Sequence, residues 1–265
     1  MTNLPTTFIG WIRRIVRNSG MSMLRGAGNT LVIAFVATVI GCLIGLLIGV
    51  AQTVPLGKGD RPAKKAALYT VRAILNIYIE VFRGTPMMAQ AFFIYFGSAL
   101  LFDINMSMWF TAFFVVSINT GAYMAETVRG GILSIDPGQT EGAQAIGMNH
   151  FQTMTSVILP QALRNIMPQI GNNFIINIKD TCVLQAIGVV ELMYASRGAA
   201  GANYRYFETF TITMAMYLAM TLFFSKVLRA VEKKMEGERT YDLATRDTLI
   251  HTSGMSRYRG GGVRQ

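Results

Sequence analysis

The first long apolar segment extends from Gly26 to Gly57 without a single charged side chain. A helix needs about 20 mostly apolar residues to cross the hydrocarbon core of a bilayer. The segment is too long for the apolar region of a cleavable signal peptide, and it has no clear small-residue cleavage site. We therefore expect residues 30–51 to form a membrane-spanning helix.

The composition agrees with a membrane protein. Only 14% of the residues are charged, whereas a soluble domain usually has about 25%. The net charge of +10 comes from basic residues at the ends of apolar segments, which favours anionic lipid headgroups over nucleic acid. Cys42, Cys182, His150 and His251 show no metal-ligand or redox spacing, so no metal site is predicted.

Four further apolar segments follow the first. They cover residues 66–101, 104–125, 161–190 and 209–225. Charged residues interrupt the first half of the 66–101 segment, and Lys179 and Asp180 interrupt the 161–190 segment near its middle. The sequence thus predicts an all-α integral membrane protein with five transmembrane helices.

Basic residues predict the orientation of these helices. They gather after the first and the fifth apolar segments, which places the C-terminus and the loop around Glu141 in the cytoplasm and the N-terminus outside. The four arginines before residue 30 disagree with this count. Apolar residues recur among them at helical spacing, so we expect residues 1–29 to form an amphipathic, extracytoplasmic segment in the membrane interface. Residues 236–265 are expected to form a flexible polar cytoplasmic tail.

Polar residues within the apolar segments indicate a binding site, because such groups are costly in a membrane. The interrupted 161–190 segment offers both donors and acceptors for a zwitterion. Its candidate substrate ligands are Asn173, Asn177, Lys179, Asp180, Thr181 and Gln185. The alternative is that these groups are satisfied by neighbouring helices.

A second set of candidate ligands lies in the 104–125 segment. Asn119 and Tyr123 are four residues apart and so share one helix face. Glu126 continues this face, and we expect it to pair locally with Arg129. We expect a structured chain break at residues 83–86, in which Arg83 is interpreted as a packing or headgroup contact rather than a substrate ligand.

The stretch from Glu141 to Pro160 reads EGAQAIGMNHFQTMTSVILP and separates two apolar segments. Pro137 and Gly138 interrupt the chain before it, and we expect a short helix over residues 139–148. Gly147 permits a sharp turn, after which residues 149–158 can form a second short helix. Pro160 naturally opens the next helix.

This stretch resembles the cytoplasmic coupling loop of ABC-importer permeases, written EAA-x3-G-x9-I-x-L-P. Five positions match that pattern in register: Glu141, Ala143, Gly147, Leu159 and Pro160. Gly142 and Val157 depart from it. The resemblance implies contacts with an ATPase by Glu141, Gly142, Ala143, Ala145, Gly147 and Met148 in a loop over residues 137–160.

Other segments resemble permeases of the polar amino acid branch, which serves histidine, arginine, glutamine and glutamate. They include FRGTP at 82–86, NTGAY at 119–123 and KDT at 179–181. The resemblance covers residues 30–235 and implies the type I ABC importer permease fold. It also implies a second permease subunit, identical or related, a dimer of ATP-binding subunits and an extracytoplasmic solute-binding protein.

The predicted function is a permease subunit that moves a polar or charged amino acid across a prokaryotic cytoplasmic membrane by alternating access. The chain has no phosphate-binding loop of the Gly-x4-Gly-Lys-Ser/Thr type. We therefore expect no enzyme activity and no cofactor in this chain, with ATP and Mg bound by the separate ATPase. The alternatives are an ion-coupled secondary transporter, a membrane scaffold and an ABC permease for a different small solute.

Overall fold

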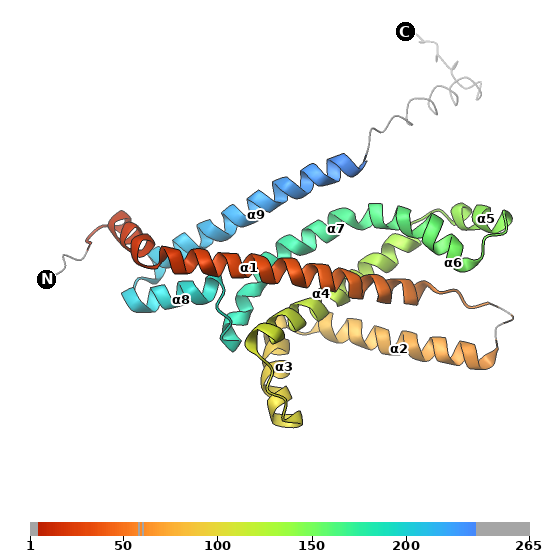
Figure 1. The fold of residues 1–265 in the computed structure, drawn as a ribbon, viewed down its shortest axis with the longest axis horizontal. Helices are drawn as coiled ribbons and strands as arrows, with labels where there is room; N and C mark the ends of the chain where they lie inside the picture. The colour runs from red at the N-terminus through yellow and green to blue at the C-terminus, as the bar shows by residue number, and fades with distance from the viewer. Residues whose placement is uncertain (1–4, 58, 60, 237–265) are drawn as a thin grey trace, which may run out of the picture.

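The computed structural model describes residues 5–57, 59 and 61–236. The predicted tail therefore lies, beyond Glu236, outside the described residues. Every regular element in the described part is a helix, as the sequence predicts (Figure 1). The longer helices are α1 (Phe8–Thr53), α2 (Pro62–Gly84), α3 (Met87–Phe102), α4 (Met108–Leu133), α7 (Leu159–Asp180), α8 (Leu192–Asn203) and α9 (Tyr206–Glu236).

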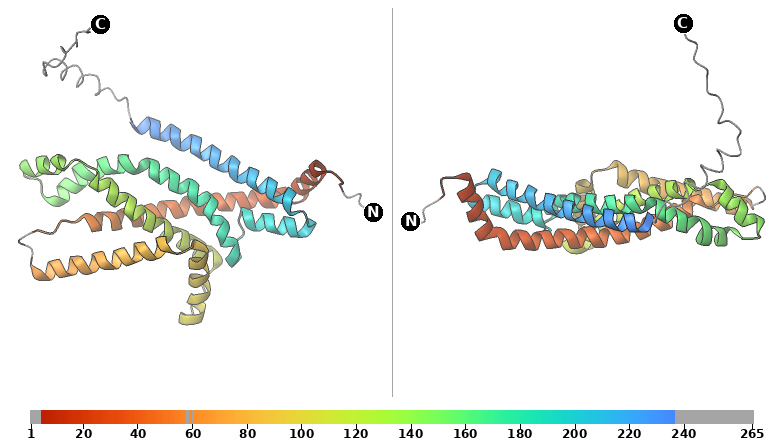
Figure 2. Two further views of the ribbon diagram at one scale, coloured as in Figure 1. Left: turned by 180° about the vertical axis from the view of Figure 1, so that it is seen from behind. Right: turned by 90° about the horizontal axis from the view of Figure 1, so that it is seen from above.

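Helix α1 extends along most of the length of the bundle and contacts α4 most extensively (Figures 1 and 2). It begins in the arginine-containing segment, where the Thr7 side chain accepts a hydrogen bond from the Gly10 amide. Residues 8–29, predicted as a separate amphipathic segment, thus belong to the same helix as residues 30–51. Trp11 and Ile15 of this part are buried.

Three glycines set the contact between α1 and α4. Gly41, Gly45 and Gly49 are four residues apart and so lie on one face of α1. Side chains added there would collide with the α4 residues Thr120, Met124 and Val128, respectively. Small residues of this kind let two helix backbones approach closely within a membrane. The glycine-rich first span therefore packs closely against α4 from Gly41 to Gly49, over about two helical turns.

Helices α2 and α3 meet at an angle of 110°. The break falls at Thr85 and Pro86, because proline has no backbone N–H for the helix ladder and disfavours helical geometry in the residue before it. The break expected at residues 83–86 is confirmed, with α2 ending at Gly84. We call this corner, residues 83–87, the elbow.

By length and composition, three of the described helices can cross a membrane: α1, α4 and α9. The bent pair of α2 and α3 would make a fourth span. Helix α7 is not among them, and it has four asparagines together with Lys179 and Asp180. The count of five spans stays a prediction.

Two short helices separate α4 from α7. They are α5 (Pro137–Ala145) and α6 (His150–Thr153), and a π-helical turn (Met154–Ile158) leads from α6 into α7. Gly147 between them has φ +86°, a backbone conformation that favours glycine. The predicted helix–turn–helix arrangement is confirmed, although its first helix ends at Ala145 rather than at residue 148. We call residues 137–158 the two-helix loop, and it lies at the opposite end of the bundle from the start of α1 (Figure 1).

The predicted fourth apolar segment is broken where its charged residues lie. Helix α7 ends at Asp180, and a 3-10 helix (Thr181–Ile187) continues to Gly188, which has φ +88°. The chain then turns into α8, whose first amides donate to the carboxylate of the wholly buried Glu191. The Tyr217 hydroxyl donates to the same carboxylate over 2.9 Å, which ties α9 to this turn.

A polar cavity and an exposed two-helix loop

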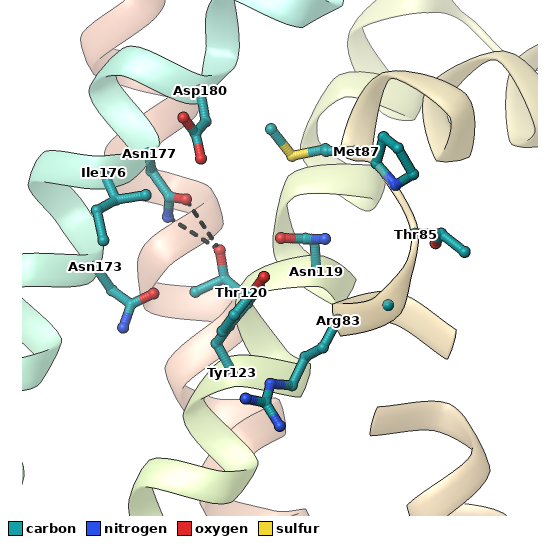
Figure 3. Close-up of a pocket in the computed structure, with 12 residues that line it drawn as sticks. Arg83, Thr85, Met87, Asn119, Thr120, Tyr123, Asn173, Ile176, Asn177 and Asp180 are labelled. Carbon is teal, nitrogen blue, oxygen red and sulfur yellow. Dashed lines mark hydrogen bonds between the residues drawn. The ribbon is translucent and has the colours of Figure 1, made fainter. Parts of the chain in front are cut away.

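A cavity of about 490 Å³ lies between the elbow, α4 and α7. Figure 3 shows its walls, with Asp180 at one end and Arg83 at the other. The elbow lines it from Arg83 to Met87, whereas α4 contributes Asn119, Thr120 and Tyr123 and α7 contributes Asn173, Ile176, Asn177 and Asp180. Two of these three walls lie at helix breaks, one at the elbow and one after Asp180.

The α7 wall follows from helix periodicity. Asn173, Asn177 and Asp180 occupy positions i, i+4 and i+7, so their side chains share one face. That face lines the cavity, and the Asp180 carboxylate forms no ion pair with any residue that the structure describes. An unpaired carboxylate beside amide groups can accept hydrogen bonds from a cation such as an ammonium group.

The side-chain amide of Asn177 is hydrogen-bonded to neighbouring helices. Its Nδ2 donates to the Thr38 Oγ1 over 2.8 Å and to the Thr120 Oγ1 over 3.0 Å, which joins α7 to both α1 and α4. The Thr120 contact is visible in Figure 3. Because Asn177 is only 5% exposed, it supports the cavity wall more than it offers polar atoms to a ligand.

Asn119 holds the elbow against α4. Its Nδ2 donates to the Phe82 carbonyl over 2.9 Å and to the Gln90 Oε1 over 3.1 Å. The Gln90 Nε2 in turn donates to the carbonyls of Phe82 and Thr85. Backbone carbonyls that a helix break leaves without their usual amide partners are satisfied here by these side chains. The elbow is thus fixed in place by two amide side chains.

Arg83 closes the other end of the cavity. Its Nη1 lies 2.5 Å from the Glu126 Oε2, and its guanidinium carbon lies 5.4 Å from the centroid of the Tyr123 ring. The sequence suggested a packing or headgroup contact for Arg83 and a local partner, Arg129, for Glu126. The structure instead pairs the two residues across α2 and α4.

The cavity gathers five of the eight predicted substrate residues: Asn119, Tyr123, Asn173, Asn177 and Asp180. The other three do not line it. Lys179 is exposed beside the lining face of α7, the wholly buried Thr181 donates to the Ile178 carbonyl, and the Gln185 amide oxygen accepts from Arg197. Sequence reasoning missed Arg83 as a lining residue, although a charge beside a helix break was a usable signal.

The two-helix loop presents a surface of mixed character. Glu141 lines a second cavity, of about 390 Å³, with residues of α6 and the ends of α1 and α4. Of the other predicted ATPase contacts, Gly142, Ala145 and Gly147 are exposed, Met148 is half-buried and Ala143 is buried. Two apolar side chains that the sequence did not single out are far more exposed, namely Ile146 at 80% and Phe151 at 75%.

Comparison with known protein families gives one match that covers most of the chain. Residues 67–237 match the family described as "Binding-protein-dependent transport system inner membrane component". The matched region contains the elbow, the cavity and the two-helix loop.

Individual relatives are similar over nearly their whole length. The glutamine transport system permease protein GlnP of Escherichia coli K12 is 38% identical over 215 residues, which cover 81% of this chain and 93% of that protein. The arginine transport system permease protein ArtQ of Bacillus subtilis 168 is 31% identical over 217 residues, which cover 81% and 92%.

Solved structures agree in fold. A crystal structure of an amino acid ABC transporter with histidines matches with a TM-score of 0.73 and 33% sequence identity, over 87% of this chain and 99% of that chain. An inward-facing structure of the methionine ABC transporter MetNI matches with a TM-score of 0.64 and 22% identity, over 80% and 95%. The second match supports the type I importer permease fold alone.

Proposed function

Because this chain belongs to the family of binding-protein-dependent transport system inner membrane components, we propose that it moves a polar or charged amino acid through an ATP-driven importer. It would be the membrane-spanning permease subunit, and its cargo would pass through the cavity between the elbow, α4 and α7. The names of the relatives, which are glutamine and arginine permeases, support this class of cargo.

The observation that carries the proposal is the chemistry of the cavity. Asp180 and Arg83 are the oppositely charged residues that line it, and amides of Asn119 and Asn173 lie between them (Figure 3). A zwitterionic amino acid needs an acceptor for its ammonium group and a donor for its carboxylate. Transporters commonly build such sites from interrupted helices, which fits the breaks at the elbow and after Asp180.

The two-helix loop would receive the driving force. It follows α4 in the chain and exposes Ile146 and Phe151 in the same loop as the exposed Glu141. This mixture of apolar and acidic groups is suited to a groove on a partner. That partner would be a dimer of ATP-binding subunits, which would bind the ATP and Mg. A second permease subunit, identical or related, and an extracytoplasmic solute-binding protein would complete the assembly.

This arrangement gives an orientation in the membrane. With the loop in the cytoplasm, the start of α1 would be extracytoplasmic, because the two lie at opposite ends of the bundle (Figure 1). ATP binding would draw the two loops of a permease pair together and open the cavity outward, and hydrolysis would return it to an inward-facing state. This is alternating access between two conformations whose populations the nucleotide shifts.

Reconstitution into proteoliposomes tests the proposal. The permease would be assembled with its ATPase and binding protein, and uptake of radiolabelled glutamine, arginine, histidine and glutamate would be followed with ATP inside the vesicles. We expect uptake of at least one of them, and only with all components and ATP present. Uptake by the permease alone under an ion gradient would contradict the proposal.

A further inference from the structure

The cavity has a neighbour that shares one of its walls. A smaller cavity of about 200 Å³ is lined by residues that include Gln52, Glu80, Arg83, Glu126 and Arg129. Glu126 and Arg129 follow Tyr123 along α4 toward α5, so the smaller cavity is the one nearer the two-helix loop. Arg83 lines both cavities.

The residue that both cavities share is part of an ion pair. The Arg83 guanidinium contacts Glu126 and lies against the Tyr123 ring. The two charged side chains are 37% and 52% exposed. Ion pairs this exposed are weak, because water screens them. Glu126 is therefore a partner that a second carboxylate can replace.

An amino acid bound in the larger cavity, between the elbow, α4 and α7, would supply that second carboxylate. Among the residues that line it, Arg83 is the cation and Asp180 the anion, and they lie at opposite ends (Figure 3). Arg83 is therefore the cationic side chain of this cavity that can bind the carboxylate of an amino acid. A guanidinium can bind a carboxylate through two parallel hydrogen bonds, so it can exchange one carboxylate for another without a change of chemistry.

We propose that the α-carboxylate of the transported amino acid binds Arg83 in place of Glu126, and that this exchange opens the wall toward the smaller cavity. Arg83 would then determine specificity for amino acids over amines. Glu126 would keep Arg83 in position and close the route when the cavity is empty. The inference rests on the proposed function, since it assigns the carboxylate of the same cargo to a particular residue.

Calorimetric binding to the assembled permease–ATPase complex in nanodiscs, without the binding protein, tests the exchange. The probes are L-glutamine and L-arginine, together with 4-aminobutanamide and agmatine, which are the same molecules without the carboxylate. Glu126→Gln removes the competitor, so both amino acids should bind roughly two- to five-fold more tightly, whereas the two amines should bind as before.

Arg83→Gln should act in the opposite direction. It should lower the affinity for both amino acids by about tenfold or more and leave the affinity for the amines nearly unchanged. Arg83→Lys should recover part of the lost affinity. Glu80→Gln is the matched control. It removes the same charge from the wall of the smaller cavity but leaves the pair between Arg83 and Glu126 intact, so its affinities should equal those of the wild type.

Two results would overturn the inference. One is that Glu126→Gln changes the affinities for amino acids and amines by the same factor, or changes them no more than Glu80→Gln does. The other is that Arg83→Gln binds the amino acids as tightly as the wild type. Failure of the wild type to bind any of the four probes, together with a lack of uptake in proteoliposomes, would contradict the proposed function itself and the inference with it.

Discussion

Gly45 of α1 lies so close to Met124 of α4 that a Cβ built on the glycine would be 2.4 Å from the Met124 Cβ. Real Cβ contacts are never so short, and the nearby atoms include α4 backbone. The neighbouring Gly41 and Gly49 have equally tight surroundings. The position of α4, and with it the α4 wall of the larger cavity, is set by this contact.

Replacement of Gly45 by alanine should therefore destabilise the protein. The added methyl group must force the two helices apart, and overpacking of this kind costs about 1–3 kcal/mol. Gly28→Ala is a matched control on the same helix, since nothing lies within 4 Å of a Cβ added there. Thermal unfolding in detergent should show a lower midpoint for Gly45→Ala only. An unchanged midpoint would mean that α1 and α4 are not packed this closely.

Gln90→Glu should loosen the elbow. The Gln90 Nε2 donates to two backbone carbonyls. A carboxylate in its place has no hydrogen to donate, so both carbonyls would lose this partner. Loss of a satisfied buried group of this kind costs about 1–3 kcal/mol. Gln169→Glu makes the same change at an exposed position on α7. Limited proteolysis should cut the Gln90→Glu protein faster near residues 83–87, and equal rates for both variants would contradict the assignment.

Asp180 and Lys179 are adjacent but should behave differently. Asp180→Asn removes the carboxylate from the larger cavity, so affinity for an amino acid should fall by about tenfold or more. Lys179→Gln alters a side chain that does not line the cavity and should leave the affinity within about twofold. Calorimetric binding to the assembled transporter separates them. Equal losses for both variants would exclude Asp180 as the specific contact.

The exposed apolar residues of the two-helix loop should stabilise the contact with the ATPase. Ile146→Ser and Phe151→Ser each remove an anchor, and loss of such an anchor weakens an interface by about tenfold or more. Ile104→Ser is the control, because Ile104 is 51% exposed but precedes α4, at the other end of that helix. Co-purification with the ATPase should fall for the first two variants. Full recovery of the ATPase with both would contradict the proposed docking surface.

Local signals in the sequence predicted much of this fold. The long segment without charged residues indicated the membrane-spanning part of α1. Pro137 and Gly147 indicated the two short helices, because proline restricts the backbone and glycine permits a sharp turn. The break after Asp180 followed from charges placed inside an apolar segment. The number of spans was harder to predict because of α7. It is so polar that hydropathy does not show whether it crosses the membrane or only packs against other helices.

The site was predicted less completely, since its contacts join distant parts of the chain. Nothing local shows that Arg83 pairs with Glu126, which is on a different helix, so the nearer Arg129 was the natural expectation. Helix periodicity could have separated Asp180 from Lys179, because Asp180 shares a face with Asn173 and Asn177 and Lys179 does not. It could not have excluded Thr181, which is four residues after Asn177 but lies beyond the end of α7. Gln185 lies on the 3-10 helix, whose direction depends on the break that precedes it.

The central claim is that the two-helix loop docks onto an ATPase in the cytoplasm, and site-directed cross-linking tests it most directly. With Cys42 and Cys182 replaced by serine, Ala145→Cys would be cross-linked to cysteines in the ATPase of the assembled transporter. We predict that a cross-link forms, that it changes with bound nucleotide, and that only reagents on the cytoplasmic side label Ala145→Cys. Labelling from the extracytoplasmic side, or the lack of any cross-link to the ATPase, would contradict the account.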